Sequence, residues 1–252
     1  MRPSLSTRAL SIRFGGHVAV DAVSADFYPG TLTVIVGPNG AGKTTYFNLI
    51  SGQLPATGGQ VFLDGADITR LGAAKRTTLG IGRAFQLTNL FAHLTVHENV
   101  RLAVQSRARL GMDMFSVWFA HAELIGRAEH YLERVALTGQ RHQRVAALSH
   151  GDKRKLEVAM LLALEPAVMM FDEPTAGMSV DEVPVVLDLI HQVKRERDKT
   201  ILLVEHKMDV VRALADRIVV LHNGALVADG EPAEVMASSI VQQAYLGTPE
   251  HA

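Results

Sequence analysis

The sequence predicts an α/β fold built around a mainly parallel sheet, and three apolar segments are the basis for this prediction. Thr31–Val36 is β-branched and continuously apolar, and it runs directly into the glycine-rich segment GPNGAGKTT. Ala167–Glu173 is a second apolar run that ends in two carboxylates, and Ile201–His206 repeats its shape. Strands without polar alternation are typical of a parallel sheet covered on both faces. The ligand site of such a sheet lies at the carboxyl ends of its strands.

Shorter patterns predict the elements in the amino-terminal part of the chain. Ala9–Phe14 and Val18–Phe27 alternate between apolar and polar residues across two glycines, so we expect an antiparallel hairpin. The glycine-rich segment leads into a helix that includes Thr45–Ser51 and that Gly52 ends. Val61–Gly65 is a short strand with a turn.

The remaining elements are mainly helical, with a ribbon near the carboxyl end. From Leu94 to Leu137 apolar residues recur at helical spacing, and we expect a mostly helical subdomain. A helix over Asp152–Leu164 follows. The segments RIVVLH and ALVADG flank Asn223-Gly224, a pair typical of a type I′ hairpin turn. A last short helix is expected around Ala233–Tyr245.

The composition excludes several classes of function. The 252 residues carry a formal net charge of -1, which gives no global basic field for nucleic acid or an anionic membrane. Because the chain has no cysteine, disulfides, thiolate zinc sites, iron–sulfur clusters and a cysteine nucleophile are excluded. The most apolar stretch, Val158–Phe171, is interrupted by Glu165 and Pro166, so no membrane span is predicted.

The glycine-rich segment matches the phosphate-binding pattern G-x-x-x-x-G-K-[ST] at every position. The matching residues are Gly37, Pro38, Asn39, Gly40, Ala41, Gly42, Lys43 and Thr44. Backbone NH groups wrap a phosphate chain in such a loop, and side chains at Gly40 and Gly42 would block that approach. Lys43 would reach the β- and γ-phosphates, Thr44 would bind Mg²⁺, and Thr45 would bond further along the phosphate chain. A glycine-rich turn with an incidental lysine is the alternative, which the preceding strand and the following helix disfavour.

Asp172 and Glu173 follow four apolar residues, so their carboxylates emerge at the ligand edge of the sheet. One carboxylate can hold Mg²⁺ through water, and the other can polarise an attacking water, as phosphoryl transfer requires. Without the phosphate loop upstream, a helix cap or a solvated turn would explain this pair better.

Five separated segments together resemble the ABC transporter ATPase subunit. They are GPNGAGKTT, Gln86, LSHGD (Leu148–Asp152), MMFDEPTAG and His206, in the order and approximate spacing of that family. The resemblance covers essentially the whole chain and implies a RecA-like P-loop NTPase core with an antiparallel β subdomain and a helical subdomain. It implies one ABC ATPase domain over residues 1–252. Residues 1–89 and 151–252 would form the catalytic core with its β subdomain, and residues 90–150 the mainly helical subdomain.

The same resemblance implies roles for individual residues. Phe14 would stack on adenine, Gln86 would sense Mg²⁺ and the attacking water, and His206 would contact the γ-phosphate. Asp172 becomes the Mg²⁺ residue and Glu173 the general base. The residue patterns alone leave other interpretations open. Phe14 also fits a core position, Gln86 an exposed loop amide, and His206 a buried histidine with satisfied hydrogen bonds.

Ser149 and Gly151 open the helix after the helical subdomain, where a hydroxyl and NH groups form an anion site or merely a cap. In the ABC family this segment reaches across a head-to-tail dimer to the γ-phosphate bound on the other subunit. The sequence departs from the family here, because His150 and Asp152 replace a glycine and a glutamine. The segment Thr175–Val180 also lacks the aspartate typical of the next loop.

Weaker similarities indicate the subtype. IGRAFQLTNLFAHLTVHENVRLA, VEHKMDVV and QQAYLG resemble ATPase subunits of importers for branched-chain and other hydrophobic amino acids, a group that also serves amides and urea. The resemblance implies ATP and Mg²⁺ as cofactors, and a second ATPase subunit, either identical or a paralogue. It also implies transmembrane permease subunits, with membrane contact only through them. The location implied is peripheral, at the cytoplasmic face of the inner membrane.

Other classes of function stay open at this stage. An exporter would carry the same ATPase motifs. A soluble P-loop ATPase acting on nucleic acid or ribosomes would need a coiled-coil insertion, a second cassette or a basic face, none of which the sequence contains. A small-molecule phosphoryl transferase would need a substrate pocket and a lid.

Overall fold

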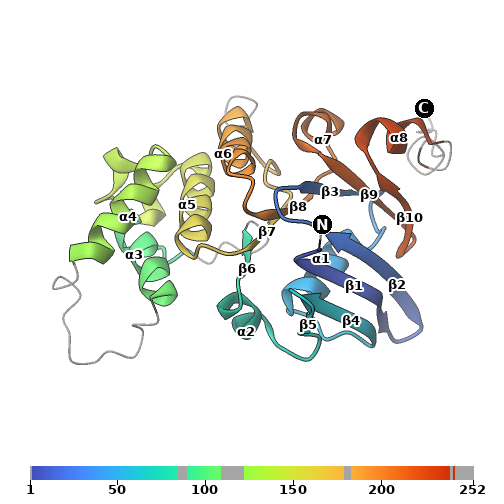
Figure 1. Ribbon diagram of the computed structural model, residues 1–252. Coiled ribbons are helices and arrows are strands. Elements are labelled where there is room, and N and C mark those ends of the chain that lie inside the picture. The colour runs from blue at the N-terminus through green and yellow to red at the C-terminus, as the bar shows by residue number, and fades with distance from the viewer. Residues whose placement is uncertain (1, 85–89, 109–121, 179–182, 239–240, 242–252) are drawn as a thin grey trace.

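The computed structural model describes residues 2–84, 90–108, 122–178, 183–238 and 241, which form two sheets and a group of helices. Figure 1 shows the two sheets on one side of the molecule and helices α3, α4 and α5 on the other. The strands are β1 (Leu5–Phe14), β2 (His17–Phe27), β3 (Leu32–Val36), β4 (Gly58–Leu63), β5 (Ala66–Asp67), β6 (Ile81–Ala84), β7 (Val168–Asp172), β8 (Thr200–Val204), β9 (Arg217–His222) and β10 (Ala225–Gly230). The helices are α1 (Lys43–Ser51), α2 (Ala73–Thr78), α3 (Val96–Arg107), α4 (Ala122–Arg134), α5 (His150–Ala163), α6 (Val183–Arg195), α7 (Met208–Leu214) and α8 (Pro232–Ala237), with short 3-10 helices at Thr138–Gln140 and Val145–Ala147.

The central sheet has six strands in the order β10-β9-β3-β8-β7-β6. All neighbours pair in parallel except β9 and β10, which form an antiparallel ribbon. Strands β3, β7 and β8 are buried at every position, as their apolar runs predict, whereas β10 at the edge is not. In β3, Val34 and Val36 pack into one hydrophobic cluster and Ile35 packs into a second cluster. The sheet therefore separates two cores, and the predicted α/β fold is confirmed.

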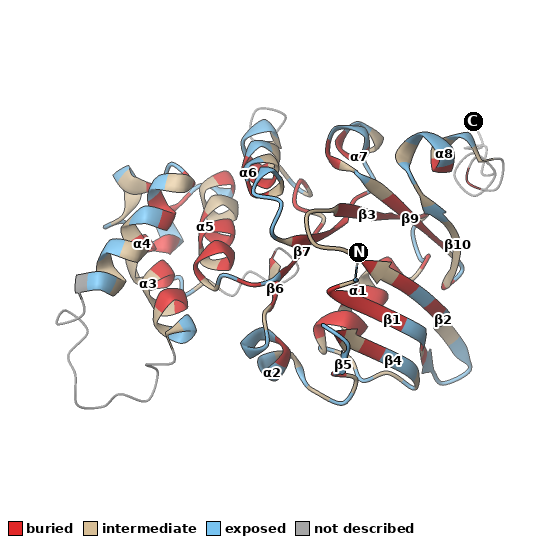
Figure 2. Ribbon diagram, in the orientation of Figure 1, coloured by how far each residue is buried: buried red, intermediate tan, exposed pale blue. Residues whose placement is uncertain are grey.

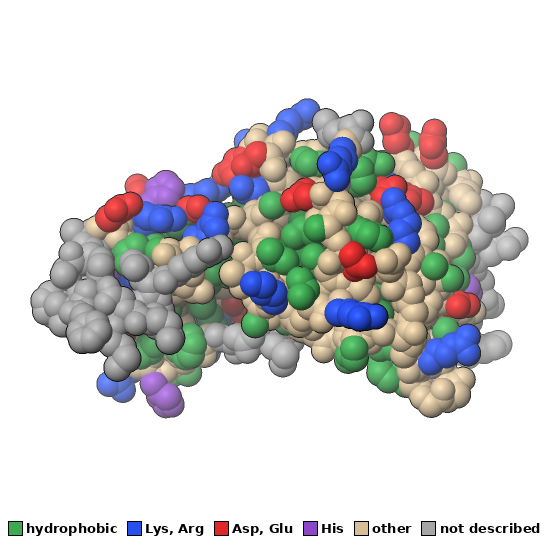
Figure 3. Space-filling model, turned by 60° about the horizontal axis from the view of Figure 1, so that its bottom comes forward, with side chains coloured by type: hydrophobic (Ala, Val, Ile, Leu, Met, Phe, Trp, Pro, Cys, Tyr) green, Lys and Arg blue, Asp and Glu red, His purple; other side chains and the backbone are tan. Residues whose placement is uncertain are grey.

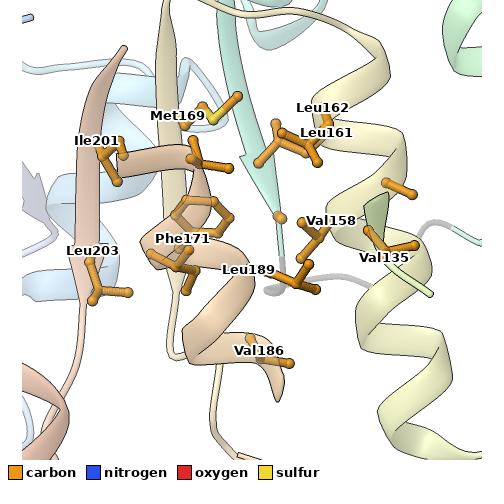
Figure 4. Packing of buried hydrophobic residues seen from close by; sticks show 14 of the residues in the cluster. Val135, Val158, Leu161, Leu162, Met169, Phe171, Val186, Leu189, Ile201 and Leu203 are labelled. Carbon is orange, nitrogen blue, oxygen red and sulfur yellow. The ribbon is translucent and has the colours of Figure 1, made fainter. Parts of the chain in front are cut away.

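Helices α5 and α6 cover one face of the sheet beside its β7 and β8 strands. Figure 4 shows Phe171 of β7 between Leu203 of β8 and Leu189 of α6, with Val158 of α5 close to Leu189. All four side chains are buried in one cluster, which also includes residues of α3, α4 and α7. The group of helices at the side of the molecule thus shares its core with this face of the sheet.

A second, antiparallel sheet covers the opposite face together with α1. Its strand order is β2-β1-β4-β5. Tyr46 and Phe47 of α1 are fully buried between the two sheets, and the Tyr46 hydroxyl lies 2.8 Å from the Thr7 hydroxyl of β1. Figure 2 shows this buried layer along β1 and α1. The helix that follows the glycine-rich loop is therefore held from both sides.

The surface carries charges of both signs. On the face shown in Figure 3, acidic and basic side chains are interspersed rather than gathered by sign. This distribution agrees with a formal net charge of -1.

Most predicted elements are confirmed, with differences at their ends. The first hairpin forms with longer strands. Helix α1 begins at Lys43 and ends at Ser51, and Gly52 caps it with a φ of 77°. The predicted turn is confirmed, because Asn223 and Gly224 have φ angles of 49° and 79°. The prediction of one helix over Ala233–Tyr245 is wrong at Ser238, where the backbone is extended with a ψ of 127°. Serine favours such helix ends because its hydroxyl competes for backbone hydrogen bonds.

Arg76 of α2 fixes the carboxyl end of α1 from within the core. Its side chain is only 2% exposed, and it donates four hydrogen bonds to backbone carbonyl oxygens. The distances are 2.6 Å to Leu49, 2.7 Å to Ile50, 2.8 Å to Leu71 and 2.8 Å to Thr69. The last carbonyls of a helix have no partner within the helix, so this guanidinium takes the place of a cap.

We predict that Arg76→Met lowers the free energy of unfolding by about 3 kcal/mol or more, because it leaves several buried carbonyl groups without donors. The matched control is Arg70→Met, which changes an exposed arginine nearby and is expected to stay within about 0.5 kcal/mol of the wild type. Urea unfolding followed by circular dichroism measures both. Equal stability of the two variants would contradict the capping role.

Candidate functional site

Three glycines with positive φ turn the chain from β3 into α1. Gly37, Gly40 and Gly42 have φ angles of 154°, 80° and 93°. A Cβ on Gly37 would lie 2.1 Å from the Leu221 carbonyl oxygen, and one on Gly42 would lie 2.4 Å from the Ala19 carbonyl oxygen. A Cβ on Gly40 would meet no atom within 4 Å. Gly40 therefore faces open space, as a phosphate cradle requires, whereas Gly42 is needed for close packing on β2 rather than for phosphate access.

Lys43 is the first residue of α1, and its ammonium group lies back over the loop. Nζ donates to the carbonyl oxygens of Gly37 at 2.7 Å and Pro38 at 2.9 Å. Burial lowers the pKa of Lys43, while the nearby carboxylates of Glu173 and Asp172 oppose this shift. A cation is thus held beside the amino-terminal end of a helix, where backbone NH groups attract an anion.

The loop borders a cavity of about 410 Å³. The lining residues are Phe14, His17, Ala19, Asn39, Gly40, Ala41, Gly42, Lys43, Thr44, Thr45 and Glu173. The cavity brings together the threonines after Lys43, an aromatic ring and a carboxylate from separate parts of the chain. Phe14 ends β1 with an exposed fraction of 51%, so it is not a core residue.

The two carboxylates at the end of β7 have different environments. Asp172 is buried, and its Oδ2 accepts a hydrogen bond from Nη2 of Arg83 at 2.5 Å. Burial raises the pKa of the Asp172 carboxyl, and the Arg83 guanidinium opposes that shift. Glu173 has a φ of 48°, a left-handed conformation that is costly for a residue with a side chain. This backbone turn accompanies the placement of the Glu173 side chain in the cavity wall.

His206 lies two residues beyond the end of β8 with half of its side chain exposed. It is therefore not a buried histidine. The fully buried Glu205 holds this turn. Its carboxylate accepts hydrogen bonds from the Thr175 hydroxyl at 2.6 Å, the His206 NH at 2.9 Å and the Lys207 NH at 3.2 Å. Glu205 thus joins the turn that carries His206 to the segment after Glu173.

Sequence reasoning missed Glu205 and Arg83 as residues that shape the site. A glutamate at the end of an apolar strand was a usable signal for Glu205, since a carboxylate there must find hydrogen-bond donors. Arg83 stands in a short strand whose pairing with β7 is not evident from local sequence.

Ser149 and Gly151 lie at the start of α5 and are not among the residues that line the cavity. The Ser149 hydroxyl caps the helix by accepting from the Asp152 NH at 3.1 Å, and Asp152 pairs with Lys155 at 2.8 Å. The ring of His150 lies close to Gly177, which follows the two carboxylates in the chain. Gln86, and Ser179 and Val180 of the atypical segment, lie outside the described residues.

The residues present fit a magnesium nucleotide. The open side of Gly40 leaves room for phosphate oxygens, and Lys43 supplies a positive charge beside it. A hydroxyl from Thr44 and a carboxylate from Asp172 are oxygen ligands of the kind that Mg²⁺ prefers. Asp172 ends β7, and the loop and α1 follow β3. These two parallel strands lie on either side of β8 in the sheet.

A family model described as ABC transporter matches residues 20–176. The chain belongs to the ABC transporter ATPase family. Similar curated proteins include the "High-affinity branched-chain amino acid transport ATP-binding protein LivG" of Escherichia coli, which is 36% identical over 251 residues and covers 98% of each chain. The protein BraF of Pseudomonas aeruginosa, with the same description, is 36% identical over 253 residues and 98% of each chain.

Solved structures of ABC ATPases share this fold. The ADP conformation of MJ1267, an ATP-binding cassette of an ABC transporter, has a TM-score of 0.83 at 28% identity, over 98% of this chain and 100% of that one. A dimeric post-hydrolysis state of MJ0796 bound to ADP and Pi has a TM-score of 0.76 at 25% identity, over 90% and 98%. Among the described residues of this ABC ATPase, no helix is both long and apolar enough to cross a membrane.

We predict that alanine substitution of Gly42 destabilises the protein more than alanine substitution of Gly40. Both residues have positive φ, which costs an L-residue about 1–2 kcal/mol. Only at Gly42 does the added Cβ collide with a carbonyl oxygen. Denaturant midpoints of Gly40→Ala and Gly42→Ala give the comparison. A Gly40→Ala variant that is the less stable of the two would contradict the assignment of Gly42 to packing.

Proposed function

We propose that this ABC ATPase powers import of branched-chain or other hydrophobic amino acids by binding and hydrolysing ATP. One observation carries the catalytic part: the phosphate-binding loop, the Asp172–Glu173 pair and the His206 turn meet at the carboxyl edge of one parallel sheet. The similarity to LivG and BraF, whose names specify branched-chain amino acid transport, supports the choice of solute. Amides and urea are the other solutes that the uptake test below distinguishes.

The residues around the cavity divide the work of phosphoryl transfer. Backbone NH groups from Gly40 to Thr45 bind the phosphate chain, with Lys43 on the β- and γ-phosphates. Phe14 offers an exposed ring in the cavity wall for adenine. Glu173 accepts the proton of the attacking water, and His206 contacts the γ-phosphate.

Thr44, Asp172 and Gln86 would hold Mg²⁺, which supplies positive charge to the phosphate oxygens when it is bound. Glu173 is then free to accept the proton of the attacking water, since Asp172 is the carboxylate that pairs with Arg83. Glu173 lines the cavity, whereas Arg83 holds one oxygen of Asp172, so the two adjacent carboxylates have separate roles.

A second ATPase subunit, identical or a paralogue, completes the site in this proposal. Ser149 and Gly151 lie at the start of α5 and do not line the cavity of their own chain. In a head-to-tail dimer they would meet the γ-phosphate on the other subunit. ATP then favours the closed dimer through contacts that ADP cannot make, and hydrolysis reverses this preference.

Transmembrane permease subunits are the proposed partners that respond to closing and reopening of the ATPase dimer. They hold the ATPase at the cytoplasmic face of the inner membrane. Phe91, five residues after Gln86 in the sequence, supports a contact with such a subunit, because it is an apolar residue that is 53% exposed. The buried Asn99 fixes the Phe91 backbone through hydrogen bonds of 2.8 and 3.2 Å. A rigidly held exposed aromatic residue is typical of a protein contact.

We predict that Glu173→Gln lowers ATP hydrolysis by at least about 100-fold, because removal of a general base costs that much or more. The amide keeps the size of the side chain, so ATP binding is retained and the variant accumulates as a nucleotide-bound dimer. Phosphate release and light scattering after gel filtration measure the two effects. The matched control is Glu133→Gln, an exposed glutamate of α4. Turnover by Glu173→Gln at the rate of this control would contradict the base assignment.

We predict that cells carrying Glu173→Gln at the chromosomal locus lose ATP-dependent uptake of leucine, isoleucine and valine. Uptake of labelled urea and acetamide is expected to stay at the wild-type rate, because these solutes would use another ATPase. The measurement is initial uptake of each labelled solute, with Glu133→Gln as the control strain. Loss of urea or acetamide uptake with normal leucine uptake would contradict the proposed solute and leave the ATPase assignment intact.

A further inference from the structure

Arg83 occupies a junction between three parts of the nucleotide site. It lies in β6, opposite Met170 of β7, and precedes Gln86 by three residues. Its side chain is 8% exposed, and that of Asp172 is 4% exposed. The ion pair between them is therefore an internal feature of the site and not a surface pair.

A second nitrogen of the Arg83 guanidinium is anchored on α1 and the turn after it. Nη1 donates to Oδ1 of Asn48 at 2.7 Å, to the Ser51 hydroxyl at 3.0 Å and to Oε1 of Gln53 at 3.1 Å. The guanidinium carbon lies 5.5 Å from the centre of the Phe47 ring. All of these partners are neutral and belong to α1 or to the turn after it. The position of Arg83 is thus set by the helix that carries the phosphate-binding loop.

This geometry needs the planar fork of arginine. One nitrogen bonds α1 while the other bonds Asp172, and both sets of bonds are made at once. A lysine ammonium is a single point that cannot reach both sides. The pair fixes Oδ2 of Asp172, and among the described residues no donor is bonded to Oδ1.

We propose that Arg83 is a positioning residue that fixes the Asp172 carboxylate relative to the phosphate-binding loop, so that its free oxygen is presented toward magnesium on the bound nucleotide. The inference rests on the proposed function, because it takes Asp172 as the magnesium-side carboxylate. Partners that orient a metal-binding side chain typically contribute about 10- to 100-fold to metal affinity. Arg83 acts on magnesium only through Asp172 and does not touch the nucleotide in this account.

The test compares nucleotide affinity with magnesium and with EDTA. A fluorescent ATP analogue is titrated into the full-length protein under both conditions, and the ratio of the two dissociation constants gives the magnesium enhancement. We expect Arg83→Met to reduce this enhancement about tenfold or more, with little change of affinity in EDTA. Arg83→Lys keeps a charge beside Asp172 and is expected to keep the protein folded, yet to lose most of the enhancement because the fork is lost.

The controls separate positioning from a general loss of structure. Arg212→Met removes an exposed arginine of α7 and is expected to retain the wild-type enhancement. Asn48→Ala weakens the anchor on α1 while the Arg83–Asp172 pair remains, and we expect an intermediate loss. Thermal unfolding of each variant without nucleotide shows which proteins are folded, and Arg83→Lys decides the matter if Arg83→Met does not fold.

Two results would overturn the inference. If folded Arg83→Lys and Arg83→Met keep the full wild-type enhancement, Arg83 only stabilises the sheet, and the proposed function stands. If the wild type itself binds nucleotide equally well with magnesium and with EDTA, the assignment of Asp172 fails, and the proposed function loses its magnesium site together with this inference.

Discussion

The turn between β3 and α1 is packed so closely that its backbone has little freedom. Gly37 and Gly42 lie against carbonyl oxygens of β9 and β2, at distances that leave no room for a side chain. The direction in which α1 leaves the sheet is thereby fixed, and so is the amino-terminal end that faces the cavity. Tyr46 and Phe47 of α1 are fully buried between the two sheets and hold the helix in place. The loop and the start of α1 are therefore positioned by the packing of the fold.

Buried charged side chains hold the other parts of the candidate site in place, as close packing holds the loop. Arg76 secures the end of α1, Arg83 links α1 to Asp172, and Glu205 links the His206 turn to Thr175. A buried charge is costly unless its hydrogen bonds are satisfied, so each of these groups is retained with several partners. For Arg83 and Glu205 we infer that the buried charge fixes geometry at the edge of the sheet, whereas Arg76 stabilises the end of α1.

The sequence predicted the parts of the fold whose signal is local. The apolar strands, the glycine-rich loop and the Asn223-Gly224 turn each carry their own pattern, and the Ser149 cap does as well. Helix α6 has buried residues at helical spacing, Val186, Leu189, Ile190 and Val193, and the same periodicity argument would have found it. The Arg83–Asp172 pair could not be predicted, because it depends on the pairing of two strands that are far apart in the chain. Glu173 likewise gives no sign of its left-handed backbone in its residue type.

Equilibrium binding of a non-hydrolysable ATP analogue with Mg²⁺ tests the central claim most directly. Isothermal titration calorimetry on the purified full-length chain measures it, with Lys43→Ala and the exposed-site variant Lys75→Ala as a matched pair. The account predicts one saturable site per chain for the wild type and for Lys75→Ala, and strongly weakened binding for Lys43→Ala. Absence of saturable binding by the wild type, or equal binding by Lys43→Ala, would contradict it.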